Sequence, residues 1–185
     1  MNKKILIIFL IILISVFPNV NLCAKDSEKP PRVTDDSDLL SEYEEKVLED
    51  KLDIISEKYD CDVIVIVVNS IGNTDPNKYA NDFFVDNGFG MGETKSGISL
   101  LINLEGRDWA VTAHSKTADK GAQKIFTYYK TDAIGNAIIT DLSAGDFYYA
   151  FDKFADLSWY YLQEDKNDFG FIKRIITLFF KTSFY

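Results

Sequence analysis

Acidic residues in this sequence gather in loops that the predicted topology places at one end of the fold. Eight acids fall there, with Arg32 and Arg107 as nearby cations: Asp35, Asp36, Asp38, Asp75, Glu105, Asp108, Asp141 and Asp146. Clusters of carboxylate oxygens suit the hard cations Ca²⁺ and Mg²⁺. We therefore predict a Ca²⁺ or Mg²⁺ site with Asp35, Asp36 and Asp108 as ligands. The alternative is that these aspartates serve helix starts, where capping and the helix dipole favour them.

Motifs for other chemistries are weak. The stretch GMGETKS at 90–96 lacks a glycine directly before Lys95 and leads into a predicted strand instead of a helix. Asp60 and Asp62 resemble a phosphatase carboxylate pair, but the pair opens its strand instead of closing it. The sequence contains no GxSxG elbow, HExxH motif or paired-cysteine zinc pattern. Phosphoryl chemistry would therefore need a metal, held by the carboxylates, to orient water and offset phosphate charge.

Two further side chains have reactive groups. His114, the single histidine, precedes Ser115 at the end of a predicted strand. It could act as a general acid or base, but we favour a solvated or hydrogen-bonded loop histidine. Cys61 lies between Asp60 and Asp62, whose charges raise a thiol pKa, so we predict a half-buried structural cysteine.

The bulk composition and the N-terminus limit the class of protein. A chain of 185 residues has room for one modest domain with extensions. Its net charge of -9 argues against nucleic-acid binding. Residues 1–24 combine Lys3 and Lys4 with an apolar run and a small Ala24, which predicts a signal peptide, with a retained N-terminal membrane anchor as the alternative. The polar, proline-containing residues 25–32 are predicted to be a linker.

Hydrophobic periodicity predicts seven elements in a domain over residues 33–165. These are a helix capped by Ser41 and Glu44, a strand at Val63–Val68, a helix from Asp75 to Asn87, strands at Ile98–Leu104 and Trp109–Ala113, a helix from Ala118 towards Ile139, and a long helix after a Ser143-to-Asp146 capping spacing. The turn between the two later strands contains Gly106, for which we predict a positive φ.

The order of these elements predicts an α/β fold. Helix, strand, helix, strand, strand, helix, helix implies a three-layer α/β/α sandwich around a small mixed sheet. A right-handed crossover makes the first two strands parallel, and the short turn makes the third antiparallel to the second.

Several short stretches resemble a known family in their order and spacing. They are VTDD at 33–36 before LLS, YA at 79–80 with NGFG at 87–90, GISLL at 97–101, RDW at 107–109 and DLSAGD at 141–146. Over Val33 to Leu162 the chain resembles the TPM domain family. Thr94, Lys95 and Ser96 stand where relatives usually carry an aspartate, and His114 stands where a glycine is common.

The resemblance implies an extracytoplasmic or luminal α/β/α domain that is often tethered to a membrane. Family members have been described as phosphomonoesterase-like, as divalent-metal binders, as photosystem assembly or repair factors, and as a receptor accessory protein. The resemblance therefore supports the fold more strongly than it supports one activity.

The last segment, residues 166–185, differs in character from the domain. On a helix, Lys173, Arg174, Thr177 and Lys181 form a narrow polar and basic stripe on a broad apolar body. This pattern is typical of a helix that lies in a membrane interface. The alternative is an extra core helix packed on the domain.

Together these features predict a secreted or membrane-associated protein on the extracytoplasmic face. We expect it to bind a divalent cation, to contact the membrane surface through its tail and N-terminal segment, and to act as an accessory or quality-control factor for envelope proteins. The alternative function is a metal-assisted phosphomonoesterase, similar to an acid phosphatase.

Overall fold

The computed structural model describes residues 30–182, with side-chain environments up to residue 167. The predicted signal segment 1–24, linker residues 25–29 and the side chains of most of the predicted tail 166–185 lie outside the described residues. Helix α6 runs from Phe147 to Thr182, so the predicted border at residue 165 falls within one continuous helix. Within the part of the chain that is described, no helix is both long and apolar enough to cross a membrane.

A four-stranded mixed sheet forms the middle of the domain. Its strands are β1 (Val33–Asp35), β2 (Asp62–Val68), β3 (Gly97–Asn103) and β4 (Asp108–His114), in the spatial order β1-β2-β3-β4. β1, β2 and β3 are parallel, and β4 is antiparallel to β3. The predicted directions of the three longer strands are confirmed. β1 was not predicted, because three residues are too few to show a strand period.

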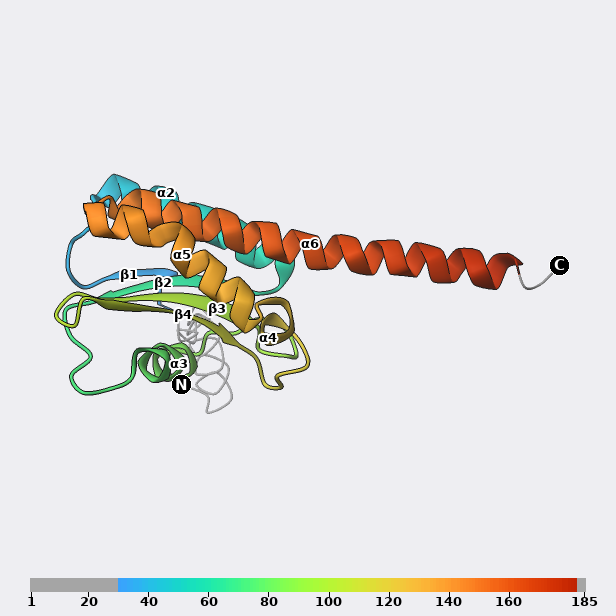
Figure 1. Cartoon of the computed structure of the whole chain (residues 1–185), viewed down its shortest axis with the longest axis horizontal. Helices are drawn as coiled ribbons and strands as arrows, with labels where there is room; N and C mark the ends of the chain where they lie inside the picture. Colours follow the sequence, from blue (N-terminus) through green and yellow to red (C-terminus); the bar gives the residue numbers. More distant parts are fainter. Residues whose placement is uncertain (1–29, 183–185) are drawn as a thin grey trace, which may run out of the picture.

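Helices cover both faces of this sheet (Figure 1). The helices α2 (Glu42–Tyr59), α5 (Tyr128–Ala144) and α6 lie over one face, and α3 (Pro76–Asp86) lies over the other. A short helix, α4 (Ala122–Ile125), precedes α5. The predicted three-layer α/β/α sandwich is confirmed.

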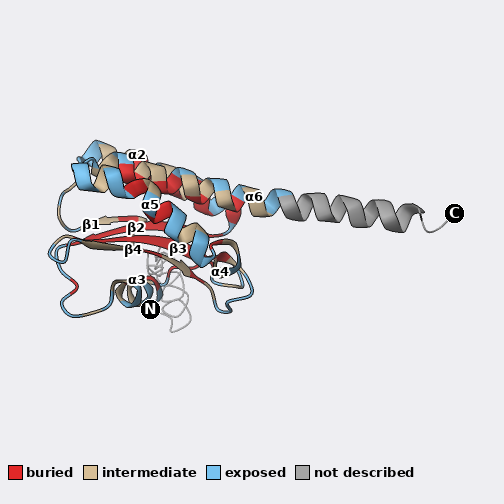
Figure 2. Cartoon of the chain, in the orientation of Figure 1, coloured by how far each residue is buried: buried red, intermediate tan, exposed pale blue. Residues whose placement is uncertain are grey.

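The side chains of β2 alternate between the two halves of the core. Val63, Val65 and Val67 pack in the larger cluster with α2, α5 and α6, whereas Ile64 and Ile66 pack in the smaller cluster with α3. All seven residues of β2 are buried, as expected for a strand covered on both faces. Figure 2 shows the buried residues along the sheet and on the helix sides that meet it.

The helix ends follow local capping chemistry. Ser41 and Glu44 form the predicted capping box, in which Glu44 Oε2 accepts from Ser41 N at 2.9 Å. The predicted Ser143 cap is wrong. Ser143 lies in the last turn of α5 and donates its hydroxyl to the carbonyl of Ile139 at 2.7 Å. Gly145 ends α5 in the left-handed conformation, with φ of 82°, and α6 begins two residues later.

Candidate functional site

The carboxyl ends of the parallel strands form one polar edge of the sheet. Asp36 follows β1, Asn69 follows β2, Asn103 ends β3, and Asp108 begins β4. Asn69 connects neighbouring loops, because its Nδ2 donates to Asp36 O at 3.2 Å and its own carbonyl accepts from Glu105 N at 2.9 Å. Loops at the carboxyl edge of a parallel sheet are the usual position of ligand sites in α/β folds.

Asn103 and Asp108 lie opposite each other where β3 and β4 meet the turn. Their side chains face the α3 layer, because they have the strand parity of Leu101 and Ala110, which pack in the α3 cluster. The Oδ1 atom of each is buried and accepts no hydrogen bond from the described residues. A buried oxygen without a donor is costly, so this pair is a candidate site for a cation or a donor group.

Gly106 leaves the space beside this pair open. A Cβ atom at residue 106 would lie 2.4 Å from Asn103 Nδ2 and 3.0 Å from both carboxylate oxygens of Asp108. The predicted positive φ of Gly106 is wrong: the left-handed residue of this turn is Arg107, with φ of 51°. Glycine therefore suits residue 106 because a side chain there would meet Asn103 and Asp108, and not because of its backbone conformation.

Asp35 has a different role from Asp108. Its carboxylate accepts from Leu40 N at 2.9 Å and Ser37 N at 3.2 Å, and so holds the loop that leads to α2. It pairs with Val67, which packs on the α2 side of the sheet, whereas Asp108 faces α3. The two residues therefore serve opposite faces.

The structure does not bring the three predicted ligands together. β2 and β3 separate β1 from β4, so Asp35 and Asp36 lie about 14 Å from Asp108 at ordinary strand spacing. One ion holds its ligands at about 2.0 to 2.6 Å and cannot join both edges. Within residues 30–182, no group of three or more His, Cys, Asp or Glu side chains is placed to hold a metal.

Arg32 lies at the other end of the sheet from the acidic loops, contrary to the prediction. Its guanidinium binds Asp53 Oδ1 through Nε at 2.5 Å and the buried carboxylate of Asp62 through Nη1. Asp62 also accepts from Gly90 N at 2.5 Å. Burial lowers the pKa of Arg32, but the carboxylates of Asp62 and Asp53 outweigh it and raise that pKa. Of the two predicted cations, Arg107 is the one at the acidic edge.

His114 lies at the far end of β4 from Asp108, about 20 Å away along the strand. It is 4 % exposed, its Nε2 lies 2.8 Å from Ser99 Oγ, and its ring stacks on Phe84 with centroids 4.0 Å apart. Burial lowers its pKa to about 4. The predicted hydrogen bond of His114 is confirmed, but the predicted loop position and the solvated alternative are wrong, because His114 is the last residue of β4 and is buried.

Cys61 is a structural thiol, as predicted, and is more deeply buried than expected at 2 % exposed. Burial raises its pKa to about 12, with smaller contributions from the charges of Asp62 and Asp60. Such a thiol is not ionised near neutral pH and does not act as a nucleophile.

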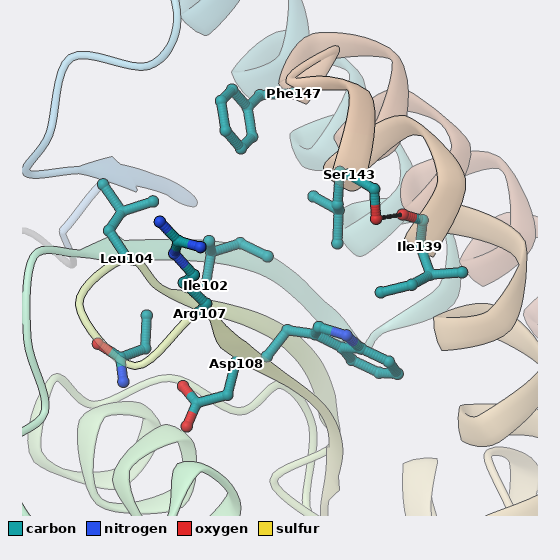
Figure 3. A pocket seen from close by; sticks show the side chains of 10 residues that line it. Ile102, Leu104, Arg107, Asp108, Ile139, Ser143 and Phe147 are labelled. Atoms are coloured by element: carbon teal, nitrogen blue, oxygen red, sulfur yellow. Dashed lines mark hydrogen bonds between the residues drawn. The ribbon is translucent and has the colours of Figure 1, made fainter.

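A cavity of about 450 Å³ lies on the opposite side of the β3–β4 hairpin from the Asp108 carboxylate (Figure 3). Its apolar walls come from the two strands, α5 and the start of α6: Ile102, Leu104, Trp109, Ile139, Leu142 and Phe147. Arg107 and Ser143 are polar residues at this cavity. Sequence reasoning missed the cavity because apolar residues at strand and helix spacing are expected in the core.

The fold and its polar edge define a class of protein: a three-layer α/β/α domain with a mixed sheet and polar loops at the carboxyl edge. The chain belongs to the TPM domain family, whose model matches residues 33–158. No curated protein matches the chain.

Solved structures with the same fold include three bacterial proteins. The N-terminal domain of a P. gingivalis protein is similar with a TM-score of 0.58 and 19% identity, over 80% of this chain and 89% of that one. The BA42 protein of Bizionia argentinensis gives 0.58 and 17%, over 69% and 84%. The N-terminal domain of the cg2496 protein of Corynebacterium glutamicum gives 0.54 and 18%, over 70% and 78%. At these identities the likeness supports the fold alone.

Proposed function

We propose that this chain is an extracytoplasmic or membrane-tethered TPM domain protein that binds Ca²⁺ or Mg²⁺ beside Asn103 and Asp108. In this proposal it acts as an accessory or quality-control factor for envelope proteins. The observation that carries the cation site is the pair of buried Oδ1 atoms that receive no hydrogen bond from described residues.

The residues present fit a hard cation. Asn103 and Asp108 supply one amide and one carboxylate oxygen, the ligand types that Ca²⁺ and Mg²⁺ prefer. Mg²⁺ in particular is often held by one or two carboxylates together with several waters. Gly106 keeps the space beside the Asp108 carboxylate free of a side chain; Asn103 has its Nδ2 atom on that side, so its amide would turn over to present Oδ1 to an ion there. A bound ion would offset the charge of Asp108 and polarise the waters that complete its shell.

The accessory role is supported by the state of the two most reactive side chains. Cys61 and His114 are buried, and His114 is held between Ser99 and Phe84. The predicted signal segment and basic tail favour a location at the outer face of a membrane.

A metal-assisted phosphomonoesterase is the second candidate, favoured by one observation. Arg107 lies at the acidic edge, and guanidinium groups bind phosphate oxygens well, but its side chain extends to the opposite side of the hairpin from the Asp108 carboxylate, so a phosphate would have to span the turn to reach both. Hydrolysis of p-nitrophenyl phosphate in the presence of Mg²⁺, lost in Asp108→Asn, would support this candidate. Cation binding without turnover would support the accessory role.

The cation site is tested by thermal unfolding of the full chain during titration with CaCl₂ or MgCl₂. An ion that binds the native state adds about 2.7 kcal/mol to the free energy of unfolding at 100 times its Kd, and so raises the melting temperature. Asp108→Asn should abolish the shift. Asp35→Asn is the matched control: it should lower the starting melting temperature but retain the shift. Leu40 N and Ser37 N each donate to a different oxygen of Asp35, and asparagine replaces one of these oxygens with an NH₂ group. A shift that is absent at millimolar cation, or that depends on Asp35 instead of Asp108, contradicts the site.

A further inference from the structure

The apolar cavity beside the β3–β4 hairpin has a single basic side chain in its lining, Arg107. The rest of its wall is dominated by Ile102, Leu104, Trp109, Leu142 and Phe147. A volume of about 450 Å³ lies within the range of about 300–1,000 Å³ that small-ligand sites occupy. The lining therefore favours a ligand with an apolar body and one anionic group.

Arg107 is positioned to bind that anionic group. Its side chain extends from the turn towards the start of α6, where Phe147 lies, while the carboxylate of Asp108 points to the opposite side (Figure 3). Arg107 is exposed, and none of the ion pairs among the described residues includes it. The planar guanidinium matches a carboxylate through two parallel hydrogen bonds.

The backbone of Arg107 adds a second observation. Its φ of 51° places it in the left-handed region, where a residue with a side chain is uncommon and glycine is preferred. Glycine occupies the preceding residue, 106, whereas the left-handed position itself is occupied by arginine. A strained residue with a side chain at a cavity is a reason to seek a function for that side chain.

The lining of the cavity contains an acceptor that distinguishes two kinds of carboxylate. Ser143 lines the cavity, and its hydroxyl donates to the carbonyl of Ile139, so its oxygen is left to accept a hydrogen bond. A peptide brings a backbone N–H that can donate to this oxygen, whereas a fatty acid brings no donor.

We propose that this cavity binds the C-terminal residue of a peptide whose last side chain is apolar, with Arg107 holding the terminal carboxylate. The apolar side chain lies between Trp109 of β4, Leu142 of α5 and Phe147 of α6. This inference goes beyond the proposed function and does not depend on the cation, because the Asp108 carboxylate faces the other side of the sheet.

The test uses the full chain with Trp159→Phe, which leaves Trp109 as its single tryptophan. Trp109 lines the cavity, so its fluorescence reports occupancy. The probes are acetyl-Ala-Leu with a free carboxylate, the same peptide as its C-terminal amide, and octanoate. The variants are Arg107→Gln and Arg107→Gly, with Lys116→Gln, an exposed cation outside this cavity, as the matched control.

We expect the free acid to bind saturably, and we expect the amide or Arg107→Gln to weaken binding about tenfold or more, since a charge-assisted hydrogen bond is lost. Lys116→Gln should bind as the parent does. Arg107→Gly should lose binding but keep its melting temperature, because glycine suits the left-handed backbone. That pair of results separates a lost ligand contact from a folding defect.

Three outcomes would overturn the proposal. They are equal binding of the acid and the amide, binding unaffected by Arg107→Gln, and preference for octanoate over the peptide. The last would assign the cavity to a fatty acid instead. No fluorescence change at millimolar peptide, with no chemical-shift change in the NMR spectrum of the same protein, would also overturn it.

Discussion

Asn103 and Asp108 face each other across the first residue pair of the β3–β4 hairpin, and each has a buried Oδ1 atom without a donor among the described residues. Cross-strand neighbours on one face of a sheet lie within about 5 Å of each other. That spacing brings the two side chains close enough for one cation or one donor group to serve both oxygens. The hairpin therefore both turns the chain and forms a small acceptor site at the acidic edge.

The first prediction concerns the glycine beside this pair. Gly106→Val should destabilise the domain by about 1 to 3 kcal/mol, because its Cβ would overlap the Asn103 side chain. Arg107→Gly, at the adjacent residue that has the positive φ, should be neutral or slightly stabilising. Urea unfolding midpoints of the two variants test this. A valine tolerated at residue 106, or a glycine that is costly at residue 107, would contradict the turn geometry.

The second prediction concerns the ion pair at the amino end of the sheet. Arg32→Ala should cost about 3 kcal/mol or more, because it leaves the buried carboxylate of Asp62 without its guanidinium. Lys46→Ala is the matched control, since it removes an exposed pair with Asp50 and should cost less than about 0.5 kcal/mol. Chemical denaturation of both variants measures the difference. Equal losses would mean that the Arg32 pair is not a buried one.

The sheet and the helix starts could be predicted because their signals are local. Val63 to Val68 is a continuous apolar run, and Ser41 with Glu44 satisfies two backbone donors within one turn. The helix start at Ser143 was predicted wrongly because the same spacing of residues also occurs by chance inside a helix. There the serine hydroxyl donates to the carbonyl one turn earlier instead of capping a helix.

The candidate site could be predicted only in part. The sequence places Asp108 beside the turn, but the grouping with Asp35 required the register and the order of strands. Because β1 was not recognised, the sequence could not show that β2 and β3 lie between Asp35 and Asp108. It also could not show that these two side chains face opposite sides of the sheet. Asn103 was missed because an amide at a strand end has no distinguishing pattern until its partner across the hairpin is known.

The third prediction concerns the C-terminal segment. Leu162 is the last buried residue that the structure describes in α6, so deletion after Asp168 should leave the domain folded. The basic stripe with Lys173, Arg174 and Lys181 predicts that the full chain without residues 1–24 floats with anionic liposomes. Flotation and circular dichroism of both forms test this. An unfolded deletion variant, or flotation without the tail, would contradict a membrane role.

The last prediction uses the buried histidine. The ring of His114 contacts Ser99 Oγ and stacks on Phe84, in a setting that also includes Asn81, Lys95 and Lys116. Burial penalises the charged ring. The cavity of about 350 Å³ beside the ring is lined by two lysines, and none of its described lining residues is an acid that could stabilise the charged form. The folded protein therefore holds His114 neutral where an unfolded chain would protonate it.

Stability should therefore fall as the pH drops through the window between the two pKa values of His114. Its pKa is about 6.5 unfolded and about 4 folded, so the unfolded chain binds the extra proton between these values. The stabilisation is complete above pH 6.5, and roughly 3 kcal/mol is lost by pH 4. His114→Gln cannot take up this proton and should show a flatter profile in urea denaturation from pH 4 to 8. Carboxylates titrate in both proteins, so their difference isolates His114. Parallel profiles would mean that the folded protein protonates His114 as readily as the unfolded chain does.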